Sequence, residues 1–387
     1  MTKPIYLDYH ATTPLDPRAL DVMLPYFTER FGNPASRQHA YGWEAQKAVD
    51  TARAQVAGLI GAVPGEVVFT SGASESNNLA IKGVAQCLRD QGRHLITAQT
   101  EHKSVLDTFK KLGTEGWDVT FLGVDREGFI DLDELRAAIT DRTVLVSVMA
   151  ANNEIGTVQP LAEIGAVARE RGVLFHTDAA QAVGKVPIDV HAMNVDLLSL
   201  TGHKYYGPKG VGALFIRRRK PRIELACQID GGGHENGFRS GTLNVPGIVG
   251  LGAAAEICRT GLDEERARLG ALRDRLLDQL RAGIDHVQVN GPLGERRLSH
   301  NLHVSFPGVD GERLLMALGD LAVSTGSACS SGSGAASHVL DAIGATSVPG
   351  ASIRFGVGRM TTEQEIDTAA ARVVKVVQSL GSAPVTA

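Results

Sequence analysis

The chain has 387 residues, more than a single hydrophobic core usually supports, so we expect two domains. A hydrophobic content of 43% and a charged content of 21% are typical of a soluble globular protein. A formal net charge of −4 gives no support to general affinity for nucleic acids or membranes. No stretch approaches the roughly twenty apolar residues needed to span a bilayer, and the first residues lack the apolar core of a signal peptide. We therefore expect a cytoplasmic protein.

In chain order, a short strand at 5–8 is followed by helical patterns at about 17–30 and 39–60. Apolar, strand-like runs then alternate with helical patterns, and they lie at 67–70, 94–97, 119–122, 144–148, 173–176, 195–200 and 211–216. Such alternation predicts an α/β fold with a mostly parallel, seven-stranded sheet covered by helices. We assign residues 16–260 to this large domain.

A long amphipathic helix is predicted at about 256–284, with leucines at three- and four-residue spacing. Beyond it, strands are predicted at 286–290, 301–306 and 352–355, and helices at 311–318 and 362–380. Together with the first residues of the chain, these elements predict a smaller α+β domain formed by residues 1–15 and 261–387.

Lys204 stands in a loop that follows an apolar strand. The run VDLLSL at 195–200 predicts a buried strand, and TGHK at 201–204 predicts the loop at its carboxyl end. Open α/β sheets bind ligands just beyond the carboxyl ends of their strands, and a lysine amine can bond covalently to a carbonyl. The alternative, for Lys204 taken alone, is a solvated loop lysine.

Three other predicted strand ends carry side chains suited to a cofactor. TSGASESN at 70–77 precedes a helix and could hold a phosphate, although an ordinary helix cap explains it as well. Asp178 closes a strand and could keep a pyridinium nitrogen protonated, or simply form a turn. His102 could stack on a flat ring, shuttle a proton, or be a hydrogen-bonded loop histidine. His300 and His303 are spaced to lie on opposite faces of a strand, so we expect no metal pair.

The four cysteines are scattered and form no C-x-x-C pair, which indicates neither a disulfide framework nor a zinc site. Cys329 differs from the others because it lies in the low-complexity stretch STGSACSSGSGAAS at 324–337. A nucleophilic cysteine must be available as a thiolate and must reach its target. Glycine and serine on both sides predict a flexible tether, so we interpret Cys329 as a nucleophile.

Ten motifs, in this order, resemble those of the cysteine desulfurases, the IscS/NifS-like group of the class V aminotransferase-like enzymes that use pyridoxal 5'-phosphate (PLP). The motifs are YLDYHATTP (6–14), FGNPAS (31–36), TSGASESNN (70–78), TEH (100–102), NNEIG (152–156), DAAQ (178–181), GHK (202–204), RSGT (239–242), GSAC (326–329) and SIRF (352–355). The similarity runs from about residue 5 to about residue 375, and it implies the PLP-dependent transferase fold type I.

The resemblance implies a role for each matching residue. Lys204 would hold PLP covalently and serve as the catalytic base, Asp178 would bind the pyridine nitrogen, and Gln181 would bind the ring hydroxyl. His102 would stack on the ring and take part in catalysis. The implied phosphate and further cofactor contacts are Ala73, Ser74, Asn153, Thr201 and His203, with Thr242 supplied by the second subunit of a homodimer. Arg354 would bind the substrate carboxylate, with Asn33 and Asn153 nearby.

The implied reaction removes sulfur from L-cysteine, leaving L-alanine and a persulfide on Cys329. A sulfur-acceptor protein would take this sulfur for iron–sulfur cluster assembly or for thiolation of tRNA or DNA, without direct contact of the chain with nucleic acid or membrane. A selenocysteine lyase, another PLP-dependent enzyme, and a cofactor-free sulfur-carrier or interaction protein remain alternatives. His10 stands where the family commonly has serine or asparagine, and the sequence assigns it no role.

Overall fold

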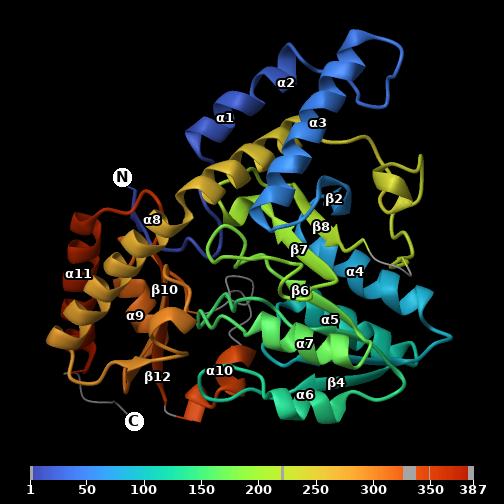
Figure 1. Ribbon diagram of the computed structural model, residues 1–387. Helices are drawn as coiled ribbons and strands as arrows, with labels where there is room; N and C mark the ends of the chain where they lie inside the picture. Colours follow the sequence, from blue (N-terminus) through green and yellow to red (C-terminus); the bar gives the residue numbers. More distant parts are fainter. Residues whose placement is uncertain (1–2, 219–221, 326–336, 348, 382–387) are drawn as a thin grey trace.

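The computed structural model describes residues 3–218, 222–325, 337–347 and 349–381, and its largest element is a seven-stranded sheet (Figure 1). The strands, in spatial order, are β2 (Val67–Thr70), β8 (Gly212–Ile216), β7 (Leu197–Thr201), β6 (Leu174–Asp178), β5 (Thr143–Ser147), β3 (His94–Ala98) and β4 (Asp118–Leu122). β8 runs antiparallel to both of its neighbours, whereas the other neighbouring pairs are parallel. The predicted, mostly parallel sheet is therefore confirmed.

Helices cover both faces of this sheet, which explains why its strands are continuous apolar runs. All residues of β2, β3, β5, β6, β7 and β8 are buried, and only the edge strand β4 has exposed positions. One face packs against α4 (Ala73–Cys87) and α5 (Lys103–Thr114). The other packs against α3 (Ala40–Leu59), α6 (Leu132–Ala138), α7 (Leu161–Glu170) and the first part of α8 (Val245–Gly283).

A second hydrophobic cluster lies under a three-stranded antiparallel sheet near the chain's C-terminal end. Its strands are β9 (Gln288–Val289), β10 (Asn301–Pro307) and β12 (Gly350–Gly356). The cluster is completed by α9 (Gly311–Ala317), α11 (Glu363–Gly381) and the second part of α8. Leu7 belongs to this cluster, because β1 (Ile5–Tyr6) pairs with β11 (Leu321–Ala322). The division into two domains stays a prediction, and this separation of clusters favours it.

Two predicted helices differ from the structure for identifiable reasons. The helix expected at 17–30 is divided into α1 (Pro17–Met23) and α2 (Pro25–Thr28), because Pro25 has no N–H to continue the hydrogen-bond ladder. The helix expected from 256 begins earlier, where Asn244 Oδ1 accepts a hydrogen bond from Gly247 N at 3.1 Å. The glycine-rich first turns of α8 let it approach α3 closely: a Cβ at Gly252 would lie 2.6 Å from Ala52 Cα.

The remaining described elements are short. They are α10 (His338–Ala342) and the 3₁₀ turns η1 (Pro64–Glu66), η2 (Gly202–Lys204), η3 (Glu235–Gly237), η4 (Gly294–Arg296) and η5 (Ala345–Ser347). The turn η2 follows β7 directly, so Lys204 lies at the carboxyl end of a central strand, as predicted. Asp178 ends the neighbouring strand β6, and both therefore reach the same edge of the sheet. Within the described ranges, no helix is long and apolar enough to cross a membrane.

Candidate active site

A cavity of about 610 Å³ opens at this edge of the sheet, between the large sheet and β12. The predicted site residues that line it are Ala73, Ser74, His102, Asn153, Asp178, Gln181, Thr201, His203, Lys204 and Arg354. They come from loops and strand ends that are far apart in the sequence, and the fold brings them together around one space. Small residues from α4 and a set of charged side chains therefore face each other across the cavity.

Lys204 reaches into the cavity from η2. Its Nζ donates hydrogen bonds to the backbone carbonyl oxygens of His10 and, at 2.9 Å, of Ala11. Two buried tyrosines, Tyr205 and Tyr206, follow it and fix the end of the turn in the core. Lys204 is therefore not the solvated loop lysine that was the alternative interpretation.

Asp178 is buried and its carboxylate is held in one orientation. Oδ2 accepts a hydrogen bond from Asn77 Nδ2 at 2.7 Å, and Oδ1 accepts one from Ala180 N at 2.9 Å. The buried Glu101 lies nearby, and burial together with the Asp178 charge raises its pKa well above the ordinary value. Asp178 thus presents a carboxylate in a fixed orientation to the cavity, next to the Glu101 carboxyl group, whose charged form is disfavoured by burial.

The N-terminus of α4 forms another wall of the cavity. Its N-cap is Gly72, which has φ +153° and supplies no side-chain hydrogen bond to the first turn. This φ favours glycine, and β8 approaches closely, since a Cβ at Gly212 would lie 2.7 Å from Gly72 Cα. The ordinary cap that was the alternative for 70–77 is absent at this position, so the first-turn N–H groups can receive an anion.

His102 caps α5 and contributes a neutral ring. Its Nδ1 accepts a hydrogen bond from Ser104 N at 3.1 Å, so the proton of the neutral imidazole is on Nε2. Burial lowers the pKa of His102, the Asp178 carboxylate opposes this effect, and the Lys204 charge adds to it. A neutral aromatic ring at this place suits stacking on a flat ligand.

Arg354 has the largest fully buried side chain among the residues that the structure describes. Its Nη2 pairs with Asp8 Oδ1 at 2.7 Å, and its Nη1 donates to the backbone oxygen of Asn153 at 3.0 Å. Among the described residues, its Nε has no hydrogen-bond partner. A buried donor without a partner is costly, so this nitrogen is suited to an anionic ligand group.

The comparisons with known proteins agree with this geometry. The family model described as Aminotransferase class-V matches residues 5–368. The cysteine desulfurase IscS of Anaeromyxobacter dehalogenans (strain 2CP-C) is 57% identical over 370 residues, which are 95% of this chain and 91% of that protein. The chain belongs to the class V aminotransferase family. Within it, this is a cysteine desulfurase of the IscS/NifS-like group.

Solved structures place the desulfurase in the same group. A NifS-like protein superposes with a TM-score of 0.90 at 37% identity, covering 97% of this chain and 100% of that one. The structure of SspA in complex with cysteine gives a TM-score of 0.79 at 39% identity and covers 92% of this chain and 99% of that one. The predicted fold class, enzyme class and PLP dependence are therefore confirmed.

The residues of the cavity fit PLP. Lys204 offers the amine for its aldehyde, Asp178 offers a carboxylate for its pyridine nitrogen, and the uncapped start of α4 offers backbone donors for its phosphate. The described residues contain no cluster of three or more histidine, cysteine, aspartate or glutamate side chains that could hold a metal ion. These groups therefore match an organic ligand that carries an aldehyde and a phosphate.

Three predicted site residues are not among those that line the cavity. Asn33 is exposed and its Oδ1 accepts a hydrogen bond from Ala35 N at 2.9 Å. Thr242 is exposed, next to the N-terminus of α8. Cys329 lies outside the described residues. Their assigned roles stay predictions.

A buried polar network surrounds Tyr206 and stabilises the turn that carries Lys204. Tyr206 has φ +67°, a conformation that side chains larger than glycine rarely adopt. Its N–H donates to Thr13 Oγ1 at 2.8 Å. Two cations lie near its ring, with Arg359 Cζ at 4.0 Å and Lys185 Nζ at 4.3 Å from the centroid.

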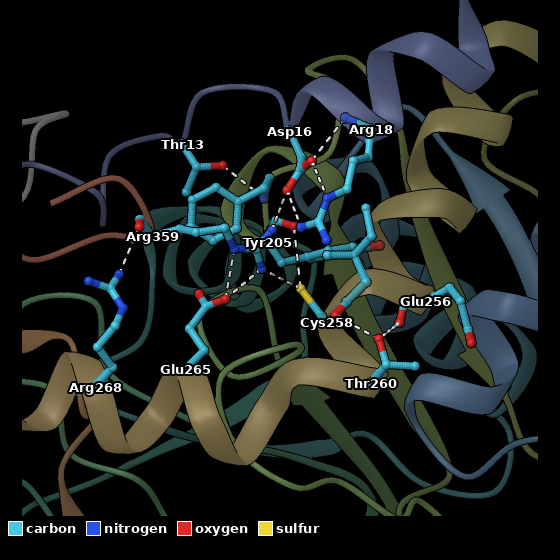
Figure 2. Close-up of polar contacts among 12 residues, drawn as sticks. Thr13, Asp16, Arg18, Tyr205, Glu256, Cys258, Thr260, Glu265, Arg268 and Arg359 are labelled. Carbon is cyan, nitrogen blue, oxygen red and sulfur yellow. Dashed lines mark hydrogen bonds and ion pairs between the residues drawn. The ribbon is translucent and has the colours of Figure 1, made fainter.

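Arg359 also pairs with two carboxylates, those of Asp16 and Glu265 (Figure 2). Its Nη1 pairs with Asp16 Oδ2 at 2.6 Å, and its Nη2 pairs with Glu265 Oε2 at 2.6 Å. We call Asp16, Lys185, Tyr206, Glu265 and Arg359 the Arg359 network. It joins the start of α1, the segments that follow β6 and η2, α8 and the loop before α11, and its member Tyr206 is two residues from Lys204 in the chain.

Sequence reasoning missed several residues in and around the cavity. Asn77, Glu101 and Ser104 shape the surroundings of Asp178, yet in the sequence they look like ordinary helix and loop residues. His10 lines the cavity as well, although the sequence assigned it no role. His10, Asn77 and Glu101 share a position inside the family motifs at 6–14, 70–78 and 100–102, whereas Ser104 lies just beyond the last of these, and no residue type alone would identify them.

Proposed function

We propose that Lys204 holds PLP covalently, with Asp178 at the pyridine nitrogen, Gln181 at the ring hydroxyl and His102 stacked on the ring. Ala73, Ser74, Asn153, Thr201 and His203 would make the remaining contacts of this chain with the cofactor. The observation that carries the proposal is the meeting of Lys204, Asp178 and the uncapped start of α4 in one cavity. Each of these three features matches a different chemical group of the cofactor.

Different residues of the cavity have different roles in catalysis. When bound, PLP withdraws electrons from the α-carbon of an amino acid. Asp178 keeps the pyridine nitrogen protonated through its fixed carboxylate, and Lys204, once released by the substrate amine, removes and returns a proton at the α-carbon. The carbonyl oxygens of His10 and Ala11 hold the lysine amine at this position. Burial of His102 keeps its ring neutral, so that it stacks without adding a positive charge.

Arg354 is proposed to bind the carboxylate of L-cysteine. Its guanidinium is held by Asp8 and by the backbone of Asn153, while its unpartnered Nε remains available among the described residues. A planar guanidinium binds a carboxylate through two parallel hydrogen bonds, which fixes the orientation of the substrate. Asn153 lies at the cavity, and Asn33 stays a predicted neighbour.

Cys329 is proposed to receive the sulfur. Its thiol attacks the sulfur of L-cysteine, so that an S–S bond forms and the bond between sulfur and the β-carbon breaks. The β-carbon takes up a proton and becomes the methyl group of L-alanine, while Cys329 keeps the sulfur as a persulfide. The carbon is reduced as the sulfur is oxidised, so the transfer needs no external oxidant.

The described residues on both sides of the segment that contains Cys329 support this role. Before the segment, Ser324 O accepts a hydrogen bond from Arg354 N at 2.6 Å. After it, His338 Nε2 donates to Glu101 O at 3.0 Å. Cys329 is four residues from Thr325, and an extended chain spans at most about 3.5 Å per residue. Its reach from Thr325 is therefore at most about 14 Å.

A homodimer is proposed as the working form, with Thr242 reaching the phosphate of the partner's site. Apolar side chains are exposed on and around α1, α2 and α3, which project from one end of the molecule in Figure 1. They include Leu24, Phe27, Phe31, Tyr41 and Trp43, each more than half exposed. An exposed apolar surface of this kind is typical of a subunit contact. Light scattering in solution tests the proposal, and a monomeric, active enzyme would contradict it.

The persulfide is proposed to pass to an acceptor protein, for iron–sulfur cluster assembly or for thiolation of tRNA or DNA. The relatives named IscS favour the first route, and the other routes stay predictions. A cytoplasmic location stays a prediction. Transfer of labelled sulfur from the loaded enzyme to candidate acceptors, measured side by side, would distinguish the routes.

Chemical reduction tests the placement of the cofactor. Borohydride reduction of the PLP-loaded protein should fix the cofactor on the peptide that contains Lys204, as identified by mass spectrometry. The matched control is Lys209, another lysine of the cavity wall. Lys209→Ala should keep the label and Lys204→Ala should lose it; a label on any other lysine would refute the assignment.

A further inference from the structure

His10 is almost fully buried, and both ring nitrogens are paired with side-chain amides. Nδ1 lies 3.1 Å from Gln181 Oε1, and Nε2 lies 3.0 Å from Asn301 Nδ2. The ring stacks on His300, with 4.4 Å between the centroids. Its backbone oxygen accepts hydrogen bonds from Gln181 Nε2, at 3.0 Å, and from Lys204 Nζ.

The orientation of the Gln181 amide follows from its contact with a backbone oxygen. A carbonyl oxygen only accepts hydrogen bonds, so the Gln181 atom that faces His10 O must be the nitrogen. The other amide atom is then the oxygen, which only accepts. Nδ1 of His10 must therefore carry a proton and donate it to Gln181 Oε1.

The orientation of Asn301 is fixed independently. Its Oδ1 accepts a hydrogen bond from Arg297 Nη1 at 2.9 Å, and its Nδ2 donates to the backbone oxygen of Glu154 at 2.9 Å. Nδ2 is thus a donor toward His10 as well, so Nε2 of His10 must be an unprotonated acceptor. His10 is confined to the neutral tautomer with its proton on Nδ1.

The charges around His10 act in the same direction. Arg354, Lys204 and Lys185 are the nearest cations, and burial together with the Arg354 charge lowers the pKa of His10 well below its ordinary value. His300, the stacked neighbour, is also buried, and its pKa is lowered as well. An imidazolium would place a second N–H against the Asn301 donor, so both geometry and charge keep the ring neutral.

We infer that His10 is a positioning residue that fixes the Gln181 amide so that it presents an N–H, and never its oxygen, to the ring oxygen of PLP. One Nε2 hydrogen of Gln181 is used by His10 O, and the second remains for the cofactor. The Nδ1–H of His10 selects this orientation, because a flipped amide would turn its NH2 group toward that donor and would also place Oε1 against His10 O. This inference rests on the proposed contact between Gln181 and the ring hydroxyl.

The arrangement has a measurable consequence for the bound cofactor. A hydrogen bond donated to the ring oxygen withdraws charge from it and weakens its hold on the proton of the lysine–cofactor linkage. That proton then dissociates at lower pH, and the pH midpoint of the visible absorption band falls. Loss of the donor orientation should raise the midpoint by about one pH unit, the size expected for one hydrogen bond to a charged group.

Two amide substitutions separate the two ring contacts. The side-chain nitrogen of asparagine, a donor, is as many bonds from Cβ as Nδ1, and the side-chain oxygen of glutamine, an acceptor, is as many bonds from Cβ as Nε2. His10→Asn therefore keeps a donor toward Gln181, whereas His10→Gln keeps only the contact toward Asn301. Both variants retain the backbone oxygen that holds Lys204.

The pH midpoint is measured by absorption on the PLP-loaded protein without substrate. We expect His10→Asn to stay near the wild-type midpoint and His10→Gln to rise by about one pH unit. The matched control is His94→Asn, since His94 is another buried histidine, bonded to Thr143 and Thr120 and not among the cavity residues. It should leave the midpoint unchanged. Equal midpoints for wild type and His10→Gln would overturn the inference.

The tautomer is tested on the cofactor-free wild-type chain. With ¹⁵N-labelled histidine, the resonances absent from the His10→Asn spectrum should show a protonated Nδ1 and an unprotonated Nε2 between pH 5 and 9. A proton on Nε2 would overturn the inference even if a variant failed to fold. A wild-type chain that develops no visible band with PLP would overturn the proposed function instead, and the ¹⁵N spectrum would still decide the state of His10.

Discussion

Replacement of Arg359 by methionine tests the network that holds the Lys204 turn. The side chain of Arg359 is 14% exposed, and those of its partners Asp16 and Glu265 are 2% and 17% exposed. Removal of one partner from a buried ion pair costs about 3–5 kcal/mol, because it leaves a buried charge without compensation. Each carboxylate keeps a second cation, Arg18 for Asp16 and Lys185 for Glu265. We therefore expect the free energy of unfolding of the variant to fall by about 3 kcal/mol, near the lower end of that range.

This loss of free energy corresponds to a decrease in the melting temperature, Tm. An unfolding entropy of about 2.1 cal/mol/K per residue gives about 0.8 kcal/mol/K for the 387 residues of the chain, so Tm should fall by about 4 °C. Calorimetry of the PLP-loaded protein measures it. The same variant should also release PLP more readily, because Arg359 covers the ring of Tyr206, two residues after Lys204.

The matched control is Arg275→Met. Arg275 Nε is also 2.6 Å from a carboxylate, that of Asp367, but both side chains are 43% exposed. Exposed pairs contribute at most about 1 kcal/mol, so Tm should change by about 1 °C or less. Equal losses in the two variants, or a larger loss for Arg275→Met, would refute the argument that burial makes the Arg359 contacts important.

Three further variants test the site and its surroundings. Asp178→Asn should retain bound PLP but lower the rate of alanine formation by on the order of 100-fold or more, and an unchanged rate would remove its role. Arg354→Lys keeps the charge but loses the planar fork, so KM for L-cysteine should rise by about 10-fold, measured by steady-state kinetics; an unchanged KM would place the substrate carboxylate elsewhere. Burial lowers the pKa of His176 to about 3, below its ordinary value of 6.5. The unfolded chain therefore binds a proton between pH 6.5 and 3 that the folded chain does not, and stability falls as the pH drops through this window. His176→Asn should reduce that slope by about 1.4 kcal/mol per pH unit in denaturant titrations, and parallel slopes would contradict it.

The large sheet could be predicted because its strands are buried on both faces. Continuous apolar runs such as VVFT at 67–70 leave few alternatives, and the polar residues that follow them mark the edge where ligands bind. Lys204 and Asp178 lie at that edge, as the sequence predicted. The proximity of these two residues was predicted from the alternation of strands and helices, without information on any contact between them.

The role of His10 could not be predicted in this way. Its partners Gln181 and Asn301 are 171 and 291 residues away in the sequence, and neither contact leaves a local pattern. The same holds for Arg359, which meets Asp16 across 343 residues. Polar networks between distant segments depend on the final packing, so only the folded structure reveals which donors and acceptors meet.

The most direct test of the central claim is a joint measurement of alanine and protein-bound persulfide after mixing the PLP-loaded protein with L-cysteine. Wild type should form both in equal amounts in the first turnover, and Cys329→Ala should bind PLP and lose the persulfide. The matched control is Cys87→Ala, which replaces an exposed cysteine and should behave as wild type. Persulfide formation at the wild-type rate in Cys329→Ala would contradict the assignment of the sulfur-accepting residue. Absence of both products from fully loaded wild-type protein would contradict the proposed reaction itself.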